Sequence, residues 1–232
     1  MTKFFTNQFL KYTMAVSLGV AILSSCKKTE SDTTAYTAIT VYNASPTAAT
    51  YDVFLGDKQL NTVALPLGGG IAYSQQLAGS YDLKFTIPGR SESVITKNVS
   101  LNQNTFNSFY LIGKPGSFDG IFTTDNVSAT STTQAFVRFI NLSSDAPALN
   151  LSITGGAIVG TSQSYKGIGS FVQINAGTYS FDVKDNATAA VKTTLLGIAL
   201  VANGYYTIVA RGLLTPVLAS ELPFGAQVVI NR

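Results

Sequence analysis

The chain of 232 residues contains no histidine, no tryptophan and a single cysteine. Without histidine there is no imidazole to act as a catalytic base or to ligate a metal or haem. One cysteine excludes an internal disulfide and a zinc site built from a cysteine cluster. The sequence therefore predicts no metal site and no cofactor.

Charged residues are also scarce, at 12% against about a quarter in an ordinary soluble domain. Serine, threonine, asparagine and glutamine must then supply most of the polar surface. The formal net charge is +3, but Lys3 and Lys11 lie in a predicted leader, and without them 13 basic side chains face 12 acidic ones. Because the only remaining basic pair is Lys27-Lys28, we expect no binding of nucleic acid.

Residues 1–25 have the pattern of a secretory signal peptide. Lys3 and Lys11 form a basic leader, and the apolar run at residues 14–23 follows it. That run is about ten residues long, whereas a helix needs roughly 20 to cross a bilayer. We therefore expect a cleaved signal rather than a membrane span.

The end of this leader, Leu23-Ser24-Ser25-Cys26, resembles a bacterial lipobox. The resemblance implies that the Cys26 thiol carries a diacylglycerol and that the new N-terminus is acylated, for example with palmitate. Several acyl chains hold a protein on a membrane almost permanently. The alternative for a lone cysteine is a buried free thiol. We expect Cys26 to be lipidated and to anchor the chain in the outer membrane of a Gram-negative envelope.

Residues 26–35 then read as the lipidated cysteine and a flexible polar tether. Lys27-Lys28 lie beside the anchor, where anionic lipid headgroups are the natural partner. Asp32-Thr33-Thr34 resembles an O-glycosylation signal, and whether Thr33 is modified stays open. The sequence also leaves open whether the protein faces the periplasm or the cell surface.

The rest of the chain is a tandem repeat. At an offset of 98 residues the segment beginning at Ala38 matches the segment beginning at Phe136, and the spacing is preserved far along both copies. We predict one domain at 36–125, a serine- and threonine-rich linker at 126–134 and a second domain at 135–232. The matched pairs include Asn43 with Asn141, Ser45 with Ser143, Gly79 with Gly177 and Tyr81 with Tyr179, and a one-residue insertion farther on pairs Gly113 with Gly212.

Both copies have the periodicity of short β-strands. Residues 51–55 and 81–85 alternate apolar and polar side chains, which is typical of a half-buried strand. Residues 106–112 and 205–210 are more continuously apolar, which favours central strands. Turn residues recur between these segments. We predict an all-β fold of two tandem antiparallel Ig-like β-sandwich domains after the lipoprotein signal peptide.

One local motif occurs in both copies. Gly79 precedes Tyr81 by two residues, and Gly177 precedes Tyr179 in the same way. This resembles the tyrosine corner of Ig-like sandwiches, in which the phenol bonds to a nearby backbone group between the sheets. We predict a structural role for the motif rather than ligand stacking.

Residues 43–55 and 137–151 are similar to the opening of the family known as domain of unknown function 4397. Its members begin with a strand, a turn like Ala-Ser-Pro-Asp-Ala-Pro and a second strand, and later have a strand that opens Ala-Gly-x-Tyr. The first copy keeps Ser45-Pro46 and the second has Asp145-Ala146-Pro147. The resemblance implies a β-sandwich in an exported bacterial lipoprotein, and it implies no catalytic residues.

Catalytic motifs are lacking. A serine or cysteine nucleophile normally needs an adjacent base, and no Ser-x-x-Lys lies near a helix start. Asp125-Asn126 and Asp185-Asn186 are expected at solvated turns, because neither belongs to the alternating acidic loop of a calcium site. A row of exposed tyrosines would suit sugar rings, but we expect at least half of the candidates in the core: Tyr42, Tyr51, Tyr73, Tyr110, Tyr165 and Tyr206.

These observations predict a membrane-anchored envelope lipoprotein that is not an enzyme. Its expected role is to bind a protein or polymer partner or to form part of a surface assembly. The first alternative is a carbohydrate-binding accessory lipoprotein of a glycan-uptake system, and a surface hydrolase is a distant third. The identity of the partner and the oligomeric state cannot be read from the sequence.

Overall fold

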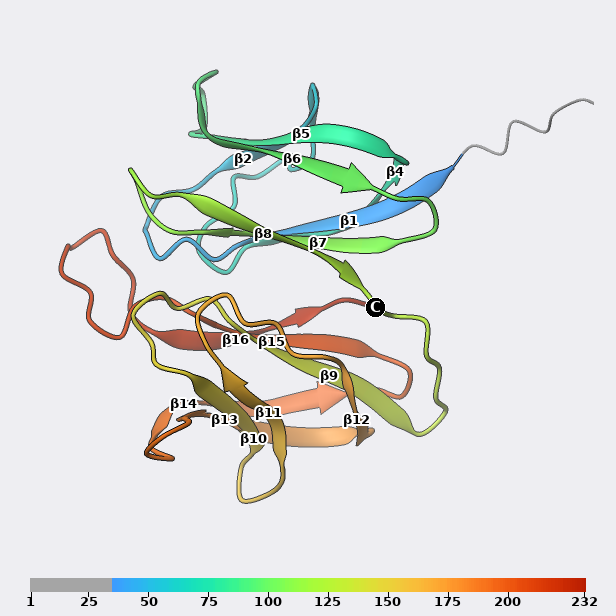
Figure 1. The fold of residues 1–232 in the computed structure, drawn as a ribbon, viewed down its shortest axis with the longest axis vertical. Helices are drawn as coiled ribbons and strands as arrows, with labels where there is room; N and C mark the ends of the chain where they lie inside the picture. The colour runs from blue at the N-terminus through green and yellow to red at the C-terminus, as the bar shows by residue number, and fades with distance from the viewer. Residues whose placement is uncertain (1–34) are drawn as a thin grey trace, which may run out of the picture. The chain divides into compact units, whose positions relative to one another are not determined.

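Sixteen β-strands make up the part of the chain that the computed structural model describes, residues 35–232. That part contains no helix, and therefore none that is long and apolar enough to span a bilayer. The predicted signal peptide, Cys26, Thr33 and the tether up to residue 34 lie outside the described residues. Figure 1 shows the strands arranged as layers of sheet.

The strands form two sets of eight with the same order. The first set, here called the first sandwich, comprises β1 (Tyr36–Asn43), β2 (Asp52–Leu55), β3 (Lys58–Gln59), β4 (Gly70–Leu77), β5 (Gly79–Thr86), β6 (Ser93–Leu101), β7 (Phe106–Ile112) and β8 (Asp119–Asp125). The second sandwich comprises β9 (Gln134–Asn141), β10 (Leu149–Ile153), β11 (Ile158–Gln163), β12 (Val172–Asn175), β13 (Gly177–Asp185), β14 (Val191–Leu200), β15 (Tyr205–Arg211) and β16 (Gly225–Ile230).

Each sandwich consists of two packed sheets. We call the sheet that faces the other sandwich the inner sheet and the sheet on the far side the outer sheet. The inner sheets have the orders β4-β1-β7-β8 and β12-β9-β15-β16, and the outer sheets have the orders β3-β2-β5-β6 and β11-β10-β13-β14. The two copies therefore have one topology, as the sequence repeat predicts. The all-β sandwich fold is confirmed, while the domain boundaries drawn from the repeat stay predictions.

Pairing is antiparallel except at one place in each inner sheet. β1 pairs with β7 in parallel, and β9 pairs with β15 in parallel. The chain between these partners passes through both sheets before it returns, so it re-enters the inner sheet in its starting direction. The predicted antiparallel sandwich thus contains one parallel ladder in each copy.

Each sandwich has its own apolar core, and a third cluster joins the two. The first core includes Tyr51 and Phe85, and the second includes Phe139 and Phe181. The cluster between the inner sheets contains the buried residues Tyr42, Ala44, Tyr110, Ile112, Ile140, Leu142 and Val209. Both faces of β1, β7, β9 and β15 are therefore covered, which explains why nearly every residue of these strands is buried rather than every second one.

The equivalent residues Asn43 and Asn141 hold the end of the first strand of each copy in place through hydrogen bonds. The Asn43 amide donates to the Leu65 carbonyl at 3.0 Å and its Oδ1 accepts from the Ser45 N–H at 2.9 Å. Asn141 and Ser143 make the equivalent contact at 3.1 Å. Both asparagines are fully buried, so each needs these partners to satisfy its amide. This need accounts for the recurrence of asparagine and serine in the repeat.

The matched glycines Gly113 and Gly212 follow β7 and β15. Their φ angles are +76° and +80°, in the region that disfavours other residues. A Cβ atom would lie 2.2 Å from the Ser117 carbonyl oxygen at the first and 2.1 Å from that of Pro223 at the second. Any larger residue would force the backbone apart at both turns.

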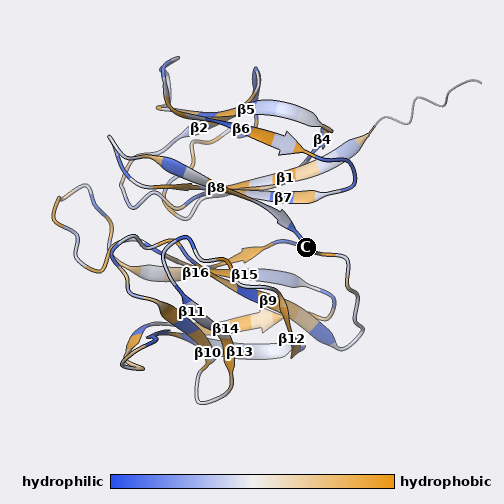
Figure 2. Cartoon of the chain, in the orientation of Figure 1, coloured by the Kyte–Doolittle hydropathy of each residue, from blue (hydrophilic) through white to orange (hydrophobic). Residues whose placement is uncertain are grey.

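The loop between β15 and β16 reaches from the second sandwich to the first. It is drawn in red at the left of Figure 1, and Figure 2 shows that parts of it are apolar. Its residues Val217 and Leu218 are exposed. The Leu222 N–H donates to the Pro46 carbonyl at 3.0 Å. The Lys114 ammonium of the first sandwich donates to Glu221 Oε1 at 2.5 Å, and the Val217 N–H donates to Oε2 of the same carboxylate at 2.7 Å.

The contacts of Glu221 in this loop predict that the fold loses stability at acid pH. The hydrogen bond from Lys114 and that from the Val217 N–H lower the pKa of Glu221 from 4.5 to about 2. A carboxyl group whose pKa falls on folding stabilises the fold above its unfolded pKa, and this contribution disappears as the pH falls through the folded pKa. We therefore expect Glu221→Gln to reduce the loss of unfolding free energy between pH 4.5 and pH 2, measured by urea denaturation.

Lys114→Met removes the main partner of Glu221 and should reduce the same loss. If Glu221→Gln kept the pH dependence of the parent chain, the carboxylate would not contribute in this way.

Candidate functional site

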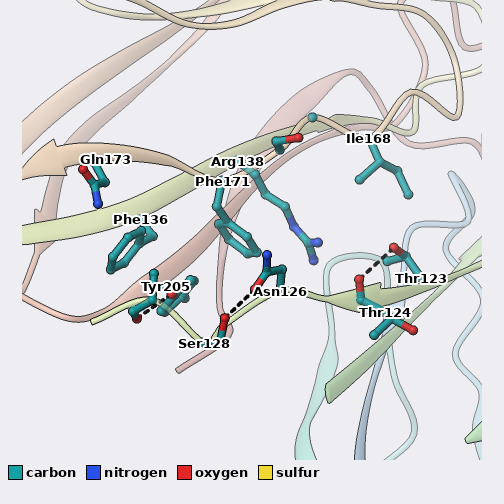
Figure 3. Close-up of a pocket in the computed structure, with 13 residues that line it drawn as sticks. Thr123, Thr124, Asn126, Ser128, Phe136, Arg138, Ile168, Phe171, Gln173 and Tyr205 are labelled. Atoms are coloured by element: carbon teal, nitrogen blue, oxygen red, sulfur yellow. Dashed lines mark hydrogen bonds between the residues drawn. The ribbon is translucent and has the colours of Figure 1, made fainter. Parts of the chain in front are cut away.

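A groove of 580 Å³ lies beside the segment that joins the two sandwiches. Its walls come from the end of β8 and the joining segment, from β9 and β15, and from the chain leading into β12 (Figure 3). The lining residues are Thr123, Thr124, Asn126, Ser128, Ala129, Phe136, Arg138, Ile168, Gly169, Ser170, Phe171, Gln173 and Tyr205.

Three aromatic rings form the apolar side of this groove. Phe136 and Tyr205 stack with centroids 4.4 Å apart, and Phe171 meets Tyr205 edge to face at 5.0 Å. Phe136 and Tyr205 are almost fully buried, whereas Phe171 is half-buried and presents its ring. The Tyr205 hydroxyl donates to the Ala129 carbonyl at 2.7 Å, which holds the joining segment against the groove.

Arg138 lies in the same wall and is only 3% exposed. Its Nη2 is 2.6 Å from Asp125 Oδ1 and donates to the Tyr110 hydroxyl at 3.1 Å, while Nε donates to the Thr207 hydroxyl at 2.8 Å. The guanidinium carbon is 4.5 Å from the centroid of the Phe171 ring. Arg138 belongs to the second sandwich, and Asp125 and Tyr110 belong to the first.

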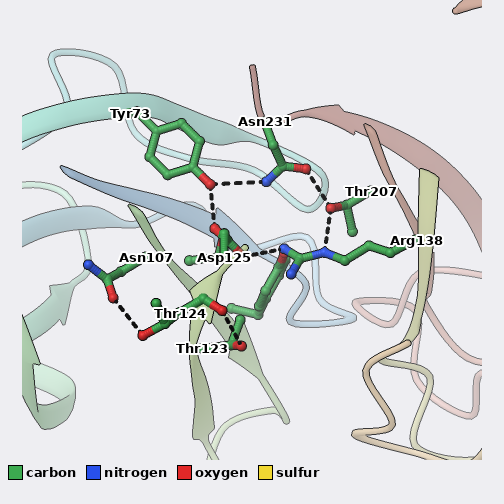
Figure 4. Close-up of polar contacts among 10 residues, drawn as sticks. Tyr73, Asn107, Thr123, Thr124, Asp125, Arg138, Thr207 and Asn231 are labelled. Carbon is green, nitrogen blue, oxygen red and sulfur yellow. Dashed lines mark hydrogen bonds and ion pairs between the residues drawn. The ribbon is translucent and has the colours of Figure 1, made fainter. Parts of the chain in front are cut away.

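Hydrogen bonds extend this ion pair into a closed ring (Figure 4). The Thr207 hydroxyl donates to Asn231 Oδ1 at 2.5 Å, and the Asn231 amide donates to the Tyr73 hydroxyl at 3.2 Å. Tyr73 in turn donates to Asp125 Oδ2, which also accepts from the Ser108 hydroxyl at 2.5 Å. The ring therefore joins the two sandwiches through side chains of both.

The tyrosines of this network stay protonated. Burial raises the pKa of Tyr73 well above 10, and the neighbouring Asp125 charge and its hydrogen bond raise it further. Burial also raises the pKa of Tyr110, against the opposing effect of the Arg138 charge. Tyr73 is thus a donor and Tyr110 an acceptor over the whole neutral range, which fixes the direction of the hydrogen bonds.

The groove offers hydrogen bonds and an aromatic ring but no acid–base pair. None of its lining residues is acidic, and Arg138 is the only charged one. A neighbouring hollow of 390 Å³ includes Asp125, which is already paired with Arg138, and Arg232. Within residues 35–232 no three acidic or cysteine side chains cluster as metal ligands would. The arrangement can hold a ligand by polar contacts.

Comparison with known protein families finds one that matches half of the chain. Residues 37–152 match the family described as domain of unknown function (DUF4397). The chain belongs to this family. The match runs from β1 of the first sandwich to β10 of the second and thus confirms the resemblance seen in residues 43–55. No curated protein matches the chain significantly.

Solved structures show weaker likeness to this DUF4397 chain. The N-terminal domain of AlgF from P. aeruginosa is 19% identical, with a TM-score of 0.30, over 40% of this chain and 95% of that domain. The family CBM26 domain CBMbc of Eubacterium rectale Amy13K, in complex with maltoheptaose, is 9% identical, with a TM-score of 0.27, over 83% and 96%. TM-scores of this size carry no conclusion about function.

The residues singled out by the sequence motif lie away from the groove. The Tyr81 hydroxyl donates to the Leu77 carbonyl at 3.0 Å, and the Tyr179 hydroxyl donates to the Asn175 carbonyl at 2.9 Å. Gly79 and Gly177 lie against these rings, where a Cβ atom would be 3.4 Å from a ring carbon. The structural role of this motif in the DUF4397 fold stays a prediction.

The tyrosines considered for sugar stacking are mostly in the core. Tyr42, Tyr51, Tyr110 and Tyr206 are buried, and the other two, Tyr73 and Tyr165, are half-buried. The prediction that at least half would be core residues is confirmed. These six side chains form no exposed row on the described surface.

The expected solvated turn at Asp125 is wrong. Asp125 ends β8, is 5% exposed and is paired with Arg138. Asp185 ends β13 and accepts the backbone N–H of Ala187 at 2.9 Å from the turn that follows, but it is also largely buried and lies 3.3 Å from the Lys192 ammonium. The sequence did carry one signal of the buried pair, because Arg138 interrupts an otherwise apolar strand and a buried arginine needs a carboxylate.

Removing one member of this pair should destabilise the chain strongly. Asp125→Asn leaves the buried Arg138 charge without a counter-charge, and we expect the free energy of unfolding to fall by about 3 kcal/mol. In the double variant with Arg138→Met, the loss should be smaller than the sum of the single losses. Urea denaturation followed by circular dichroism measures all three.

The matched control is Asp119→Asn, which breaks exposed ion pairs with Lys97 and Lys166. This change should cost less than about 1 kcal/mol. Equal losses for Asp119→Asn and Asp125→Asn would contradict the importance of the buried pair.

Proposed function

We propose that this chain is an envelope lipoprotein with a non-catalytic binding role. The observation that supports this role is the groove beside the joining segment, whose lining combines the Phe171 ring with hydroxyl and amide side chains and has no carboxylate. Sites that bind small polar ligands commonly combine aromatic surface with a few placed polar groups. Phe136, Arg138 and Tyr205 of this groove lie on the central strands β9 and β15, which favours a preformed site.

The buried acidic side chains support the non-catalytic part of the proposal, because they are engaged in structural contacts. Asp145 Oδ1 accepts the Leu214 N–H at 2.9 Å, and Asp182 Oδ1 accepts the Thr194 hydroxyl at 2.8 Å. Asp119, Asp125 and Glu221 form the ion pairs between the sandwiches. A catalytic carboxylate would instead face a cavity in which substrate could reach it.

The membrane anchor is the second part of the proposal and rests on sequence. The predicted signal peptide ends in Leu23-Ser24-Ser25-Cys26, and the lysine pair Lys27-Lys28 follows it. An acylated Cys26 would hold residues 35–232 at the outer membrane through the short tether.

A carbohydrate partner is the favoured alternative to a protein partner. Phe171 is half-buried beside the exposed polar residues Thr124, Asn126, Ser128 and Gln173. An apolar ring next to hydroxyl and amide groups suits a sugar, whose C–H face and hydroxyl groups need both. A surface hydrolase remains the third candidate and has no such observation in its favour.

Substitution of the cysteine tests the anchor. In cells supplied with labelled palmitate, Cys26→Ser should abolish incorporation into the chain and remove it from the outer-membrane fraction, because serine has no thiol for the diacylglycerol. Ser31→Ala, a change in the tether, is the control and should leave both readouts unchanged. Palmitate incorporation that persisted in Cys26→Ser would overturn the anchor.

A further inference from the structure

One guanidinium nitrogen of Arg138, Nη1, has no hydrogen-bond acceptor among the described residues. The Arg138 Nε and Nη2 atoms bond to Thr207, Tyr110 and Asp125 (Figure 4). No hydrogen bond joins Nη1 to any of residues 35–232. The side chain is 3% exposed and lines the groove. Figure 3 shows the guanidinium group beside the Phe171 ring, directed toward the side of the groove formed by Asn126 and Thr124.

Charge limits which group this nitrogen can accept as a partner. Asp125 already neutralises Arg138, and the groove has no other charged lining residue. An anionic ligand would leave an uncompensated negative charge next to the buried carboxylate of Asp125, which is costly where water is excluded. A neutral oxygen acceptor satisfies Nη1 without this cost. The ligand therefore carries a carbonyl or a hydroxyl group rather than a carboxylate.

The other lining residues indicate which further groups the ligand must carry. Phe171 and Ile168 are half-buried apolar side chains close to Arg138, so a small apolar group can pack next to the carbonyl. On the other sides, Thr124, Asn126 and Gln173 are exposed and can bond to hydroxyl groups. A carbonyl joined to a methyl group, on a body rich in hydroxyl groups, matches these three features.

We propose that the groove binds a neutral oligosaccharide that carries acetamido groups. The acetamido carbonyl accepts from Arg138 Nη1, its methyl group packs against Phe171 and Ile168, and the sugar hydroxyl groups bond to Asn126 and Gln173. This assignment rests on the proposed binding role and names the class of ligand. A peptide cannot add as a strand to β9 or β15, because these are central strands whose backbone groups are already paired on both sides. The hydroxyl and amide side chains of the lining favour a sugar.

The residues that form the groove differ from those at the equivalent positions of the first copy. Phe136 and Arg138 stand where the first copy has Ala38 and Thr40 at the same offset. The first copy therefore lacks both the arginine and the aromatic stack. This difference supplies matched controls, because Gln75 is the exposed counterpart of Gln173 in the first copy.

Titration calorimetry tests the proposal on the full chain, purified in a detergent without a sugar headgroup. The probes are tri-N-acetylchitotriose, cellotriose as the matched sugar without acetamido groups, and an N-acetylated trialanine amide. We expect the acetamido trisaccharide to bind about tenfold more tightly than cellotriose, since it gains a hydrogen bond and a buried methyl group. The peptide should bind more weakly than the acetamido sugar.

Variants locate the binding in the groove. Phe171→Ala should weaken binding of the acetamido trisaccharide about tenfold and Gln173→Ala about threefold, whereas Gln75→Ala should leave it unchanged. Circular dichroism confirms that each variant is folded. If Phe171→Ala does not fold, Gln173→Ala still tests the groove, because Gln173 is exposed and its replacement should not disturb the fold.

Each other result overturns a defined part of the account. Equal affinity for cellotriose would overturn the acetamido assignment and leave the binding role intact. Tighter binding of the peptide would replace the sugar by a protein ligand. Absence of binding by every probe, or unchanged binding in both groove variants, would overturn the groove as the site, and the lipid anchor would still be judged by palmitate labelling alone.

Discussion

The pairing of Asp125 with Arg138 is the contact on which the arrangement of the two sandwiches depends. Each charge is buried, so each would be strongly unfavourable alone. Four neighbouring polar groups bond to the pair directly, and Asn231 closes the ring between Thr207 and Tyr73. Because the donors and acceptors come from both copies, the ring is complete only in one relative placement of the inner sheets. The surrounding apolar cluster supplies attraction between the sheets, and the ring supplies their register.

Duplication followed by divergence explains how one fold forms both halves of this contact. Thr40 and Arg138 occupy equivalent positions in the two copies, as do Tyr73 and Phe171. In the first copy Tyr73 bonds to Asp125, and in the second the Phe171 ring packs against Arg138. The same backbone position thus contacts opposite members of one ion pair. The groove that we assign to a sugar follows from this asymmetry, because it exists only where the larger residues are present.

Much of the fold could be predicted from the sequence, because it depends on local patterns. Alternation in residues 51–55, turn residues and the repeat indicate two copies of a strand-rich unit, and the structure has them. The contact between the inner sheets could not be predicted, since the continuous apolar runs of β7 and β15 indicate burial on both faces without saying what covers them. Asp125 was expected in solvent because an Asp-Asn pair is typical of turns, and only Arg138, far away in sequence, reverses that expectation. The candidate site was missed for the same reason, because it needs residues from β8, β9, β12 and β15 together.

Hydrogen exchange followed by mass spectrometry tests most directly whether the buried ring makes the two sandwiches one cooperative unit. In rising concentrations of urea, the backbone amides of β7 and β15 should lose protection together in the parent chain. In Asp125→Asn the two strands should lose it at separate concentrations, because the sheets no longer hold each other. If β7 and β15 exchanged independently in the parent chain, or together in the variant, the claim that this ion pair couples the copies would be contradicted.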